Sequence, residues 1–423
     1  MNLKVSHISF SDIGGGAARA AYRIHHSLRK SGVDSHMYVC KPQSGDWTVK
    51  YGKKKRDKIF IIFREQLGRF FSNFLKAKGA ALHSPAFLNS NLVSKINKSD
   101  CDLVHLHWIS GEMISISDIS CIKKPIVWTL HDMWAFCGAE HYAEDERWKT
   151  GYFKENRPSN ELGFDLNRWT WKRKYRKWKK PIQIVAPSKW LTNCAKESAL
   201  MKAWPIAHIP YSLDLSVWKP IEKKLAKDIL NLPDDKFIIL FGAVGGTQNP
   251  RKGFDLLKAA LEFLKNKDIK NIELLVFGEL EPEFGNNFEY PVHYTGRLND
   301  DTSLRVLYSA ADIFALPSRQ DNLPLTGMES LACGTPVIGF NVTGIPDIIK
   351  HKKTGYLASP FSHSDFAEGI IWAMSEYNSS KSNLDLSLNC RNYAVNHFSE
   401  LMVSMSYINI YNRLKNNIKS NQS

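Results

Sequence analysis

The chain has 423 residues, and its 57 Lys and Arg against 42 Asp and Glu give a formal net charge of +15. With 43% hydrophobic residues it does not have the composition of a disordered chain, and because a single core usually stops growing at about 250 to 300 residues, two domains are expected. The seven cysteines are scattered and form no Cys-x-x-Cys pair, which argues against a disulfide framework or a cysteine zinc site and favours a reducing compartment.

In the first half of the chain, short β-rich apolar runs alternate with helical stretches. The first helix is the clearest, because Ala21, Ile24 and Leu28 fall on one helical face and Gly32 offers a C-terminal stop. This βαβ rhythm predicts a parallel sheet covered by helices on both faces. The predicted strands are residues 5–10, 35–40, 103–108, 126–130 and 182–186.

The same rhythm starts again after a proline-punctuated stretch, residues 205–233. We therefore expect an α/β chain of two Rossmann-like, doubly wound domains, residues 1–212 and 213–397, facing each other across a cleft. The Ser- and Asn-rich stretch 378–389 is predicted as a loop, and a final helix, about 398–423, is expected to pack back on the first domain. In the second half, strands are predicted at residues 237–244, 272–277, 292–295, 313–316 and 336–340, and helices at 254–265, 301–310 and 324–332.

The positive excess lies in two segments that are also rich in aromatic residues. Residues 53–78 hold nine Lys and Arg against two acids, and residues 146–180 hold twelve against four, so together they account for the whole net charge. If the second segment is a helix, its aromatic side chains lie along one stripe and its cations along an adjacent stripe. The residues expected to contact a membrane are Trp171, Tyr175 and Trp178 with Arg168 and Lys172.

Three interpretations of these segments are open. They can lie on an anionic membrane, where each cation near the surface contributes about 1 kcal/mol. They can also be a core face with a solvated basic side, or they can bind nucleic acid through phosphates and stacked bases. No window approaches the roughly 20 apolar residues of a membrane span, and the N-terminus lacks the basic and apolar regions of a secretory signal.

The strongest motif follows the predicted strand 313–316, where a polar loop enters a helix that Pro324 can open. Asp321 precedes this helix. Glu329 lies on the helix, separated from Asp321 by seven residues. The amides at the start of a helix can bind oxygen-rich ligands, and a carboxylate can hold a ribose through paired hydroxyls. The alternative is an acidic cap on an ordinary helix.

This segment resembles the signature of retaining glycosyltransferases of the GT-B fold, family four, in which an acidic residue, seven spacers and a glutamate stand before Gly-x-Pro-Val. Asp321 takes the place of the family's first glutamate, and the Asp-Asn-Leu-Pro sequence is similar to the branch that builds bacterial exopolysaccharide and O-antigen chains, of the colanic-acid type. The resemblance implies that Glu329 binds the nucleotide ribose. It also implies a donor-sugar site made of Asp321, Asn322, Leu323, Pro324 and Leu325.

Three further motifs fit the same family. Arg251 and Lys252 stand at a predicted strand-to-helix turn, where cations can neutralise a diphosphate and stabilise a departing nucleotide. The glycine loop with Gly15 and Gly16 opens the first helix, and the resemblance implies that it faces the diphosphate and the acceptor. His131 follows a predicted strand, and the resemblance makes it the histidine that contacts the donor sugar. Taken alone, these motifs are also compatible with a solvated turn, close packing and a local hydrogen bond.

A zinc site is a further alternative, because His105 and His107 share one strand face and Cys137 and His141 follow later in the chain. These residues show neither helical nor knuckle spacing, and the implied reaction needs no metal-polarised step. We therefore expect no metal and no other cofactor.

The resemblance as a whole implies a metal-independent retaining hexosyltransferase with His131, Asp321 and Lys252 as its catalytic residues. Its expected partners are a nucleotide diphosphate sugar, a lipid-linked oligosaccharide acceptor and an anionic membrane surface, with no nucleic acid. Its expected location is the cytoplasm, peripheral on the inner face of the cell membrane. A GT-B nucleotide-sugar epimerase and a basic nucleic-acid-binding protein remain the alternative functions.

Overall fold

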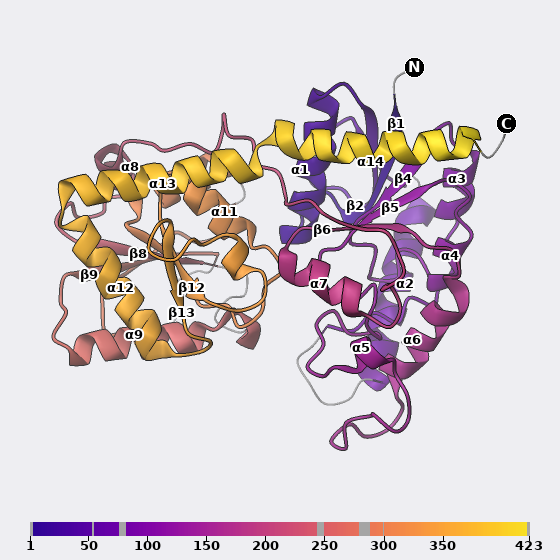
Figure 1. Ribbon diagram of the computed structural model, residues 1–423, viewed down its shortest axis with the longest axis horizontal. Helices are drawn as coiled ribbons and strands as arrows, with labels where there is room; N and C mark the ends of the chain where they lie inside the picture. Colours follow the sequence, from indigo (N-terminus) through magenta and orange to yellow (C-terminus); the bar gives the residue numbers. More distant parts are fainter. Residues whose placement is uncertain are drawn as a thin grey trace. The chain divides into compact units, whose positions relative to one another are not determined.

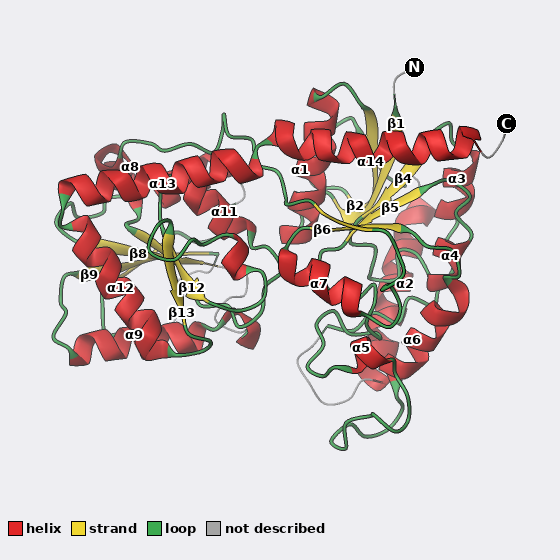
Figure 2. Ribbon diagram, in the orientation of Figure 1, coloured by secondary structure: helices red, strands yellow, loops and turns green. Residues whose placement is uncertain are grey.

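The computed structural model describes residues 3–52, 55–75, 82–242, 249–278, 288–298 and 300–420. The chain divides into two units, which we describe separately (Figure 1). Unit 1 comprises Met1–Tyr211 and Val403–Ser423, and unit 2 comprises Ser212–Met402. In both units the strands lie in the middle and helices lie outside them (Figure 2).

Unit 1 is built on a seven-stranded parallel sheet of order β3-β2-β1-β4-β5-β6-β7. Strands β2 and β3 lie on one side of β1, and strands β4 to β7 lie on its other side. The strand order therefore reverses between β1 and β4. At this switch point His7 of β1 pairs in register with His105 of β4. The strands are β1 (Lys4–Ser11), β2 (Asp34–Lys41), β3 (Val49–Lys50), β4 (Leu103–Leu106), β5 (Ile126–Thr129), β6 (Gln183–Ala186) and β7 (Ile206–His208).

The C-terminal helix of unit 1 is fixed to the sheet through buried polar contacts. The Tyr411 hydroxyl lies 2.6 Å from Nδ1 of His105, and the Tyr407 hydroxyl lies 2.9 Å from Oγ1 of Thr129. The last helix thereby covers strands β4 and β5. The helices of unit 1 are α1 (Gly16–Lys30), α2 (Lys55–Leu75), α3 (Leu92–Lys98), α4 (Ile116–Ser120), α5 (Arg147–Thr150), α6 (Leu166–Lys177), α7 (Lys189–Glu197) and α14 (Glu400–Ser420), which begins in unit 2 and enters unit 1 at Val403.

Unit 2 is built on a six-stranded parallel sheet of order β10-β9-β8-β11-β12-β13. The order reverses between β8 and β11, where Ile239 pairs in register with Ile313. Parallel strands buried on both faces read as continuous apolar runs, as the Phe237–Gly242 segment does. The strands are β8 (Phe237–Gly242), β9 (Ile272–Phe277), β10 (Val292–Tyr294), β11 (Ile313–Leu316), β12 (Val337–Phe340) and β13 (Gly355–Ala358).

Helix α13 of unit 2 occupies most of the stretch that we predicted as a loop, so that prediction is wrong. Leu386, Cys390 and Ala394 repeat every four residues and are buried, which gives this Ser- and Asn-rich segment an apolar stripe. Arg391 extends from the helix and donates to the carbonyls of Leu215 and Ala332. The helices of unit 2 are α8 (Lys223–Ile229), η1 (Pro250–Lys252), α9 (Phe254–Asn266), α10 (Asp301–Ala310), α11 (Leu325–Ala332), η2 (Ile345–Asp347), α12 (His363–Tyr377) and α13 (Ser380–Phe398).

The predicted fold class is confirmed, because both units are Rossmann-like layers of helices around a parallel sheet. Within the described ranges, the helices are too short or too polar to cross a membrane. In each unit, the carboxyl ends of the two strands at the switch point mark the edge where ligands of this architecture bind.

Candidate functional site

The loops that follow β8 and β11 meet at the switch point of unit 2. Nζ of Lys252 lies 2.6 Å from Oδ2 of Asp321, and the Ser318 hydroxyl donates to the same oxygen at 3.3 Å. The Lys252 side chain is 23% exposed and that of Asp321 13%, so the pair lies at the protein surface but is largely shielded from water. This ion pair brings together two residues that the sequence predicted to be functional.

The turn between η1 and α9 can have only glycine at residue 253. Gly253 has a φ of +68°, and a Cβ atom added there would lie 2.0 Å from the carbonyl oxygen of Pro317. The missing side chain therefore lets the β8 loop approach the β11 loop directly. Arg319 reinforces this approach, because its guanidinium donates to both carboxylate oxygens of Asp255 at 2.7 and 2.5 Å.

Asp321 is held as a carboxylate. Burial alone would raise its pKa, but the positive charges of Lys252 and Arg251 and the hydrogen bonds from Lys252 and Ser318 outweigh burial and lower the pKa below its usual value. Its backbone is fixed as well, since its N–H donates to the Thr343 hydroxyl at 3.1 Å and its carbonyl accepts from Gly344 N–H at 3.0 Å. A fixed negative charge beside two cations is thus present at this edge before any ligand binds.

Helix α11 begins directly after this loop. Its N-cap is Pro324, which provides no side-chain cap, so the first amides of the helix have no capping side chain. Asn322, Leu323 and Leu325 are buried. Glu329 lies one turn into the helix, is 4% exposed, and accepts from the Tyr308 hydroxyl at 3.1 Å. The predicted sugar and ribose residues therefore lie on the loop and helix that the ion pair holds in place.

The glycine loop of unit 1 lies at the corresponding edge, after β1. Gly15 has a φ of +97° and is the N-cap residue of α1, a backbone conformation that favours glycine. A Cβ atom at Gly15 or Gly16 would meet no described atom within 4 Å, so close packing does not explain these two glycines. Both glycines are exposed.

His131 follows β5 and belongs to a chain of buried imidazoles. Its Nδ1 lies 2.8 Å from the Tyr211 hydroxyl, and its Nε2 lies 3.2 Å from Nδ1 of His107. His107 continues the chain, because its Nε2 lies 2.9 Å from Nδ1 of His7. Burial lowers the pKa of His131 to about 4, despite the nearby charge of Asp132, so the ring is neutral at pH 7. Both ring nitrogens of His131 have partners inside unit 1.

His7 also belongs to this row of buried imidazoles, and the sequence did not predict it. Its position on β1 carries a usable signal, because a histidine on β1 and one on the neighbouring β4 must lie side by side when the strands are parallel and in register. The strand order that makes β1 and β4 neighbours is what the sequence alone did not supply.

The structure brings together two of the four alternative zinc ligands, His105 and His107, with His7 as a third histidine. Among the described residues, the groups whose ligand atoms lie within 4.8 Å of one another are His7, His105 and His107, and His25, His26 and Asp46. Neither group includes the predicted candidates Cys137 and His141. His141 instead bonds to Asp132 at 2.5 Å, and burial raises the pKa of the Cys137 thiol.

Two of the predicted membrane contacts at α6, Trp171 and Trp178, are wrong because both side chains are buried. Trp171 and Trp178 are both 5% exposed and belong to the core of unit 1, where the Trp178 indole donates to the Ile116 carbonyl at 2.9 Å. Lys174 between them is buried too and donates to the carbonyls of Trp134, Cys137 and Gly138, so this side of the helix faces the core. Tyr175 is 53% exposed. Arg168 and Lys172 are half-buried on the outer side.

Comparison with known proteins identifies both halves of the chain. Residues 222–394 match the family described as "Glycosyl transferases group 1", and residues 14–217 match "Glycosyltransferase Family 4". A "D-inositol 3-phosphate glycosyltransferase 2" from Catenulispora acidiphila is 30% identical over 172 residues, which are 37% of this chain and 40% of that protein. The chain therefore matches less than half the length of this curated relative.

Solved structures share the fold over nearly the whole chain. Sucrose-phosphate synthase from Thermosynechococcus elongatus has a TM-score of 0.67 and 18% identity, with 98% of this chain and 99% of that one covered. WaaG, a glycosyltransferase involved in lipopolysaccharide biosynthesis, has a TM-score of 0.60 and 15% identity, with 96% and 99% covered. Anabaena HepE in complex with UDP-glucose has a TM-score of 0.61 and 14% identity, with 99% and 100% covered. Each half of the chain thus matches a glycosyltransferase family, and the chain as a whole has the fold of the solved GT-B glycosyltransferases.

Proposed function

We propose that this protein is a retaining glycosyltransferase that moves a sugar from a nucleotide diphosphate sugar to a lipid-linked surface polysaccharide acceptor. The observation that carries the proposal is the ion pair of Lys252 and Asp321, at the switch point of unit 2 and beside the start of α11. This edge combines cations, a carboxylate and helix amides. The cations and amides can bind the phosphates of a sugar nucleotide, and the carboxylate can accept from its hydroxyls.

In the proposed complex, the donor lies on unit 2. Lys252 and Arg251 hold the diphosphate, and Glu329 accepts from the ribose hydroxyls. Asp321 binds the sugar, together with the backbone from Asn322 to Leu325. Asp321 already neutralises Lys252 in part, so the arriving diphosphate competes with this carboxylate for the same ammonium group.

The proposed chemistry keeps the anomeric configuration. The diphosphate leaves through an oxocarbenium-like state, the acceptor hydroxyl attacks from the same face, and the leaving phosphate takes the hydroxyl proton. Arg251 and Lys252 stabilise the charge that develops on the leaving group, the task that a metal ion performs in other enzymes. Unit 1 supplies the acceptor side with the loop of Gly15 and Gly16. His131, neutral at pH 7, contacts the donor sugar by exchanging one of its internal partners, Tyr211 or His107, for a sugar hydroxyl.

Relatives support the donor and acceptor classes. HepE was solved in complex with UDP and with UDP-glucose, which supports a nucleotide-sugar donor, and WaaG acts in lipopolysaccharide biosynthesis, which supports a surface glycan of the O-antigen or exopolysaccharide type. The inositol phosphate glycosyltransferases favour a second candidate acceptor, a soluble phosphorylated polyol. The epimerase and nucleic-acid alternatives find no support among these relatives.

We also propose that the protein acts in the cytoplasm, peripherally on the inner face of the cell membrane, because a lipid-linked acceptor is held there. The charge distribution supports this location: unit 1 contains 38 Lys and Arg against 18 acids, whereas unit 2 contains 19 against 24. The basic excess is thus confined to the unit that receives the acceptor in this proposal.

A donor screen followed by product analysis tests the proposal. Thermal-shift measurements with UDP-, GDP- and ADP-sugars are expected to show stabilisation by one nucleotide class, since a ligand that binds only the folded state raises apparent stability. The selected donor, incubated with polyprenyl diphosphate oligosaccharide, is expected to give a product of the donor's own anomeric configuration by NMR. An inverted product contradicts the retaining mechanism, and donor conversion without an acceptor indicates the epimerase.

A further inference from the structure

Helix α2 of unit 1 is amphipathic in the reverse of the usual sense. Its inward face carries Arg64 and Glu65, which are 5% and 9% exposed, and Gly68. Arg64 donates from Nε to the carbonyl of Glu112 at 2.9 Å and from Nη2 to that of Leu88 at 2.6 Å. A Cβ atom at Gly68 would lie 2.4 Å from Cγ of Glu112, so the polar face is in close contact with the body of the unit.

The outward face of α2 is mainly apolar, although the exposed side chains of Gln66 and Arg69 lie on or beside it. Ile59, Phe63 and Phe70 follow helical spacing on one side of the helix and are 58%, 59% and 61% exposed. Phe60 and Ile62 beside them are exposed as well. A helix that served only the fold would bury these side chains and expose its charges. An exposed apolar face of this kind marks an interaction site.

A track of aromatic rings joins α2 to the segment before α6. The rings of Phe71 and Phe87 lie 5.3 Å apart, those of Phe87 and Trp169 6.4 Å, and those of Trp169 and Phe164 6.3 Å. Phe70, on the outer side of α2, contacts Phe71 at 5.6 Å. The apolar face of α2 therefore continues onto the loop that leads into α6.

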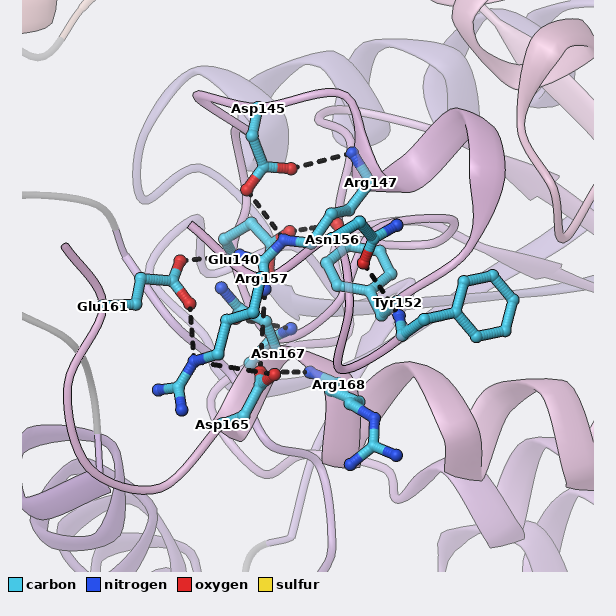
Figure 3. Close-up of polar contacts among 12 residues, drawn as sticks. Glu140, Asp145, Arg147, Tyr152, Asn156, Arg157, Glu161, Asp165, Asn167 and Arg168 are labelled. Carbon is cyan, nitrogen blue, oxygen red and sulfur yellow. Dashed lines mark hydrogen bonds and ion pairs between the residues drawn. The ribbon is translucent and has the colours of Figure 1, made fainter. Parts of the chain in front are cut away.

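This loop is held by an internal network of ion pairs (Figure 3). The Arg147 guanidinium donates to Asp145 at 2.8 Å and to Glu161 at 2.6 Å, and Arg157 donates to the Gly163 carbonyl at 3.0 Å. Arg147 is 3% exposed, so these charges form the inside of the loop. Leu162 and Phe164 extend from it and are 79% and 48% exposed. The network keeps apolar side chains in water at a fixed position.

Cations lie next to these apolar side chains. Helical spacing places Lys172 and Arg176 on the outer side of α6, between the exposed rings of Trp169 and Tyr175. Just after the helix, Nζ of Lys179 lies 4.7 Å from the centre of the Tyr175 ring. The guanidinium of Arg173 lies 4.5 Å from the centre of the Trp169 ring. The apolar surface thus has a basic border on its α6 side.

We propose that this docking face, made of Ile59, Phe63, Phe70, Leu162, Phe164 and Trp169 with the basic border of α6, inserts into an anionic phospholipid leaflet. Aliphatic and aromatic tips beside lysines match acyl chains below anionic headgroups. Isoleucine and leucine tips do not stack on bases, and a second copy would place one basic border against another. The proposal rests on the proposed function only in giving the protein a reason to be at a membrane.

Vesicle flotation of the full chain tests this proposal. The vesicles contain phosphatidylglycerol mixed with phosphatidylcholine, and pure phosphatidylcholine serves for comparison. We expect binding to the anionic vesicles that weakens as salt rises from about 0.1 to about 1 M, because the Debye length falls from about 10 to about 3 Å. The double variants Phe63→Ser/Phe70→Ser and Leu162→Ser/Phe164→Ser are each expected to bind at least about tenfold more weakly.

The matched control is Ile229→Ser/Leu401→Ser, which removes side chains that are 56% and 69% exposed on unit 2. It is expected to float like the wild type, and circular dichroism and melting temperature show that all variants fold. Unchanged flotation of both docking-face variants overturns the proposal. Two other results also overturn it if the wild type does not bind vesicles. One is a dimer in sedimentation, and the other is an oligonucleotide complex, that the docking-face variants abolish. Flotation needs no sugar donor, so its failure leaves the donor screen informative, and the reverse also holds.

Discussion

Lys252 and Asp321 are separated by 69 positions in the sequence, yet Nζ of one lies 2.6 Å from Oδ2 of the other. The two residues follow β8 and β11, the neighbouring strands between which the order of the unit 2 sheet reverses. The topology therefore creates the contact, and Gly253 permits it by letting the two loops approach. In the proposed reaction, the same ammonium group leaves Asp321 in part to bind the donor diphosphate.

Replacing Lys252 by alanine is expected to lower kcat/KM for sugar transfer by about 10²- to 10³-fold, because it removes a charge that stabilises the leaving diphosphate. Steady-state kinetics with the selected donor measure this loss. Lys270→Ala is the matched control, since that side chain is 80% exposed at a distant end of unit 2 and should retain full activity. Wild-type turnover by Lys252→Ala would refute the assignment.

Gly253→Ala is expected to destabilise unit 2 by more than about 2 kcal/mol and to abolish donor binding. The added methyl group meets the Pro317 carbonyl oxygen and forces the loops apart. Gly32→Ala isolates the steric part: Gly32 also has a positive φ, of +84°, but a Cβ atom there meets nothing within 4 Å. Thermal melts of both variants are compared, and equal destabilisation would show that the Pro317 contact is unimportant.

Acid is expected to destabilise unit 1 because its buried histidines are neutral. Burial lowers the pKa of His131 to about 4, of His7 to about 3 and of His25 to about 2. An unfolded histidine titrates near pH 6.5, so below this pH the unfolded chain binds more protons and the folded state loses stability as pH falls toward the folded pKa values. The three residues together should cost about 4 kcal/mol between pH 7.5 and 5.5.

Urea unfolding at the two pH values, followed by tryptophan fluorescence, measures this loss. Ten of the twelve tryptophans lie in unit 1, so the signal reports mainly on that unit. His25→Gln is expected to reduce the loss by the share of one histidine, about 1.4 kcal/mol. A free energy of unfolding that stays constant from pH 7.5 to 5.5 would mean that these histidines are not neutral in the folded protein.

Lys174→Met is expected to lower the free energy of unfolding by about 3 kcal/mol. The ammonium group donates to the carbonyls of Trp134, Cys137 and Gly138 and lies 3.9 Å from the centre of the Trp134 ring, so methionine leaves three buried acceptors without this donor. Lys172→Met, on the outer side of the same helix, is the control and should change stability by less than about 0.5 kcal/mol. Equal effects at the two positions would contradict the burial of Lys174.

The sequence predicts the fold class well because parallel strands read as apolar runs separated by helical periods. It fails at α13, where Ser and Asn suggest a loop, because packing of Leu386, Cys390 and Ala394 overrides local preference. It also misassigns Trp171 and Trp178, since periodicity shows that residues share a face but not which face is buried. Trp169, two positions earlier, lies on the exposed side instead.

The contacts of the candidate site could not be predicted from the sequence. Lys252, Asp321 and Glu329 were identified because each lies in a sequence motif with a defined spacing. The pairing of Lys252 with Asp321, and of His107 with His7, depends on which strands are neighbours, and strand order is a property of the whole sheet. The sequence marks residues 53–78 as a basic and aromatic segment, but it does not show which side of α2 is exposed, because Arg64 and Glu65 look like surface residues.

A crystal structure with the nucleoside diphosphate that gives the largest thermal shift tests the donor site most directly. We expect a diphosphate oxygen about 3 Å from Nζ of Lys252 and the ribose hydroxyls on the carboxylate of Glu329. A diphosphate bound away from the edge between β8 and β11, with the Lys252–Asp321 ion pair undisturbed, would contradict the account.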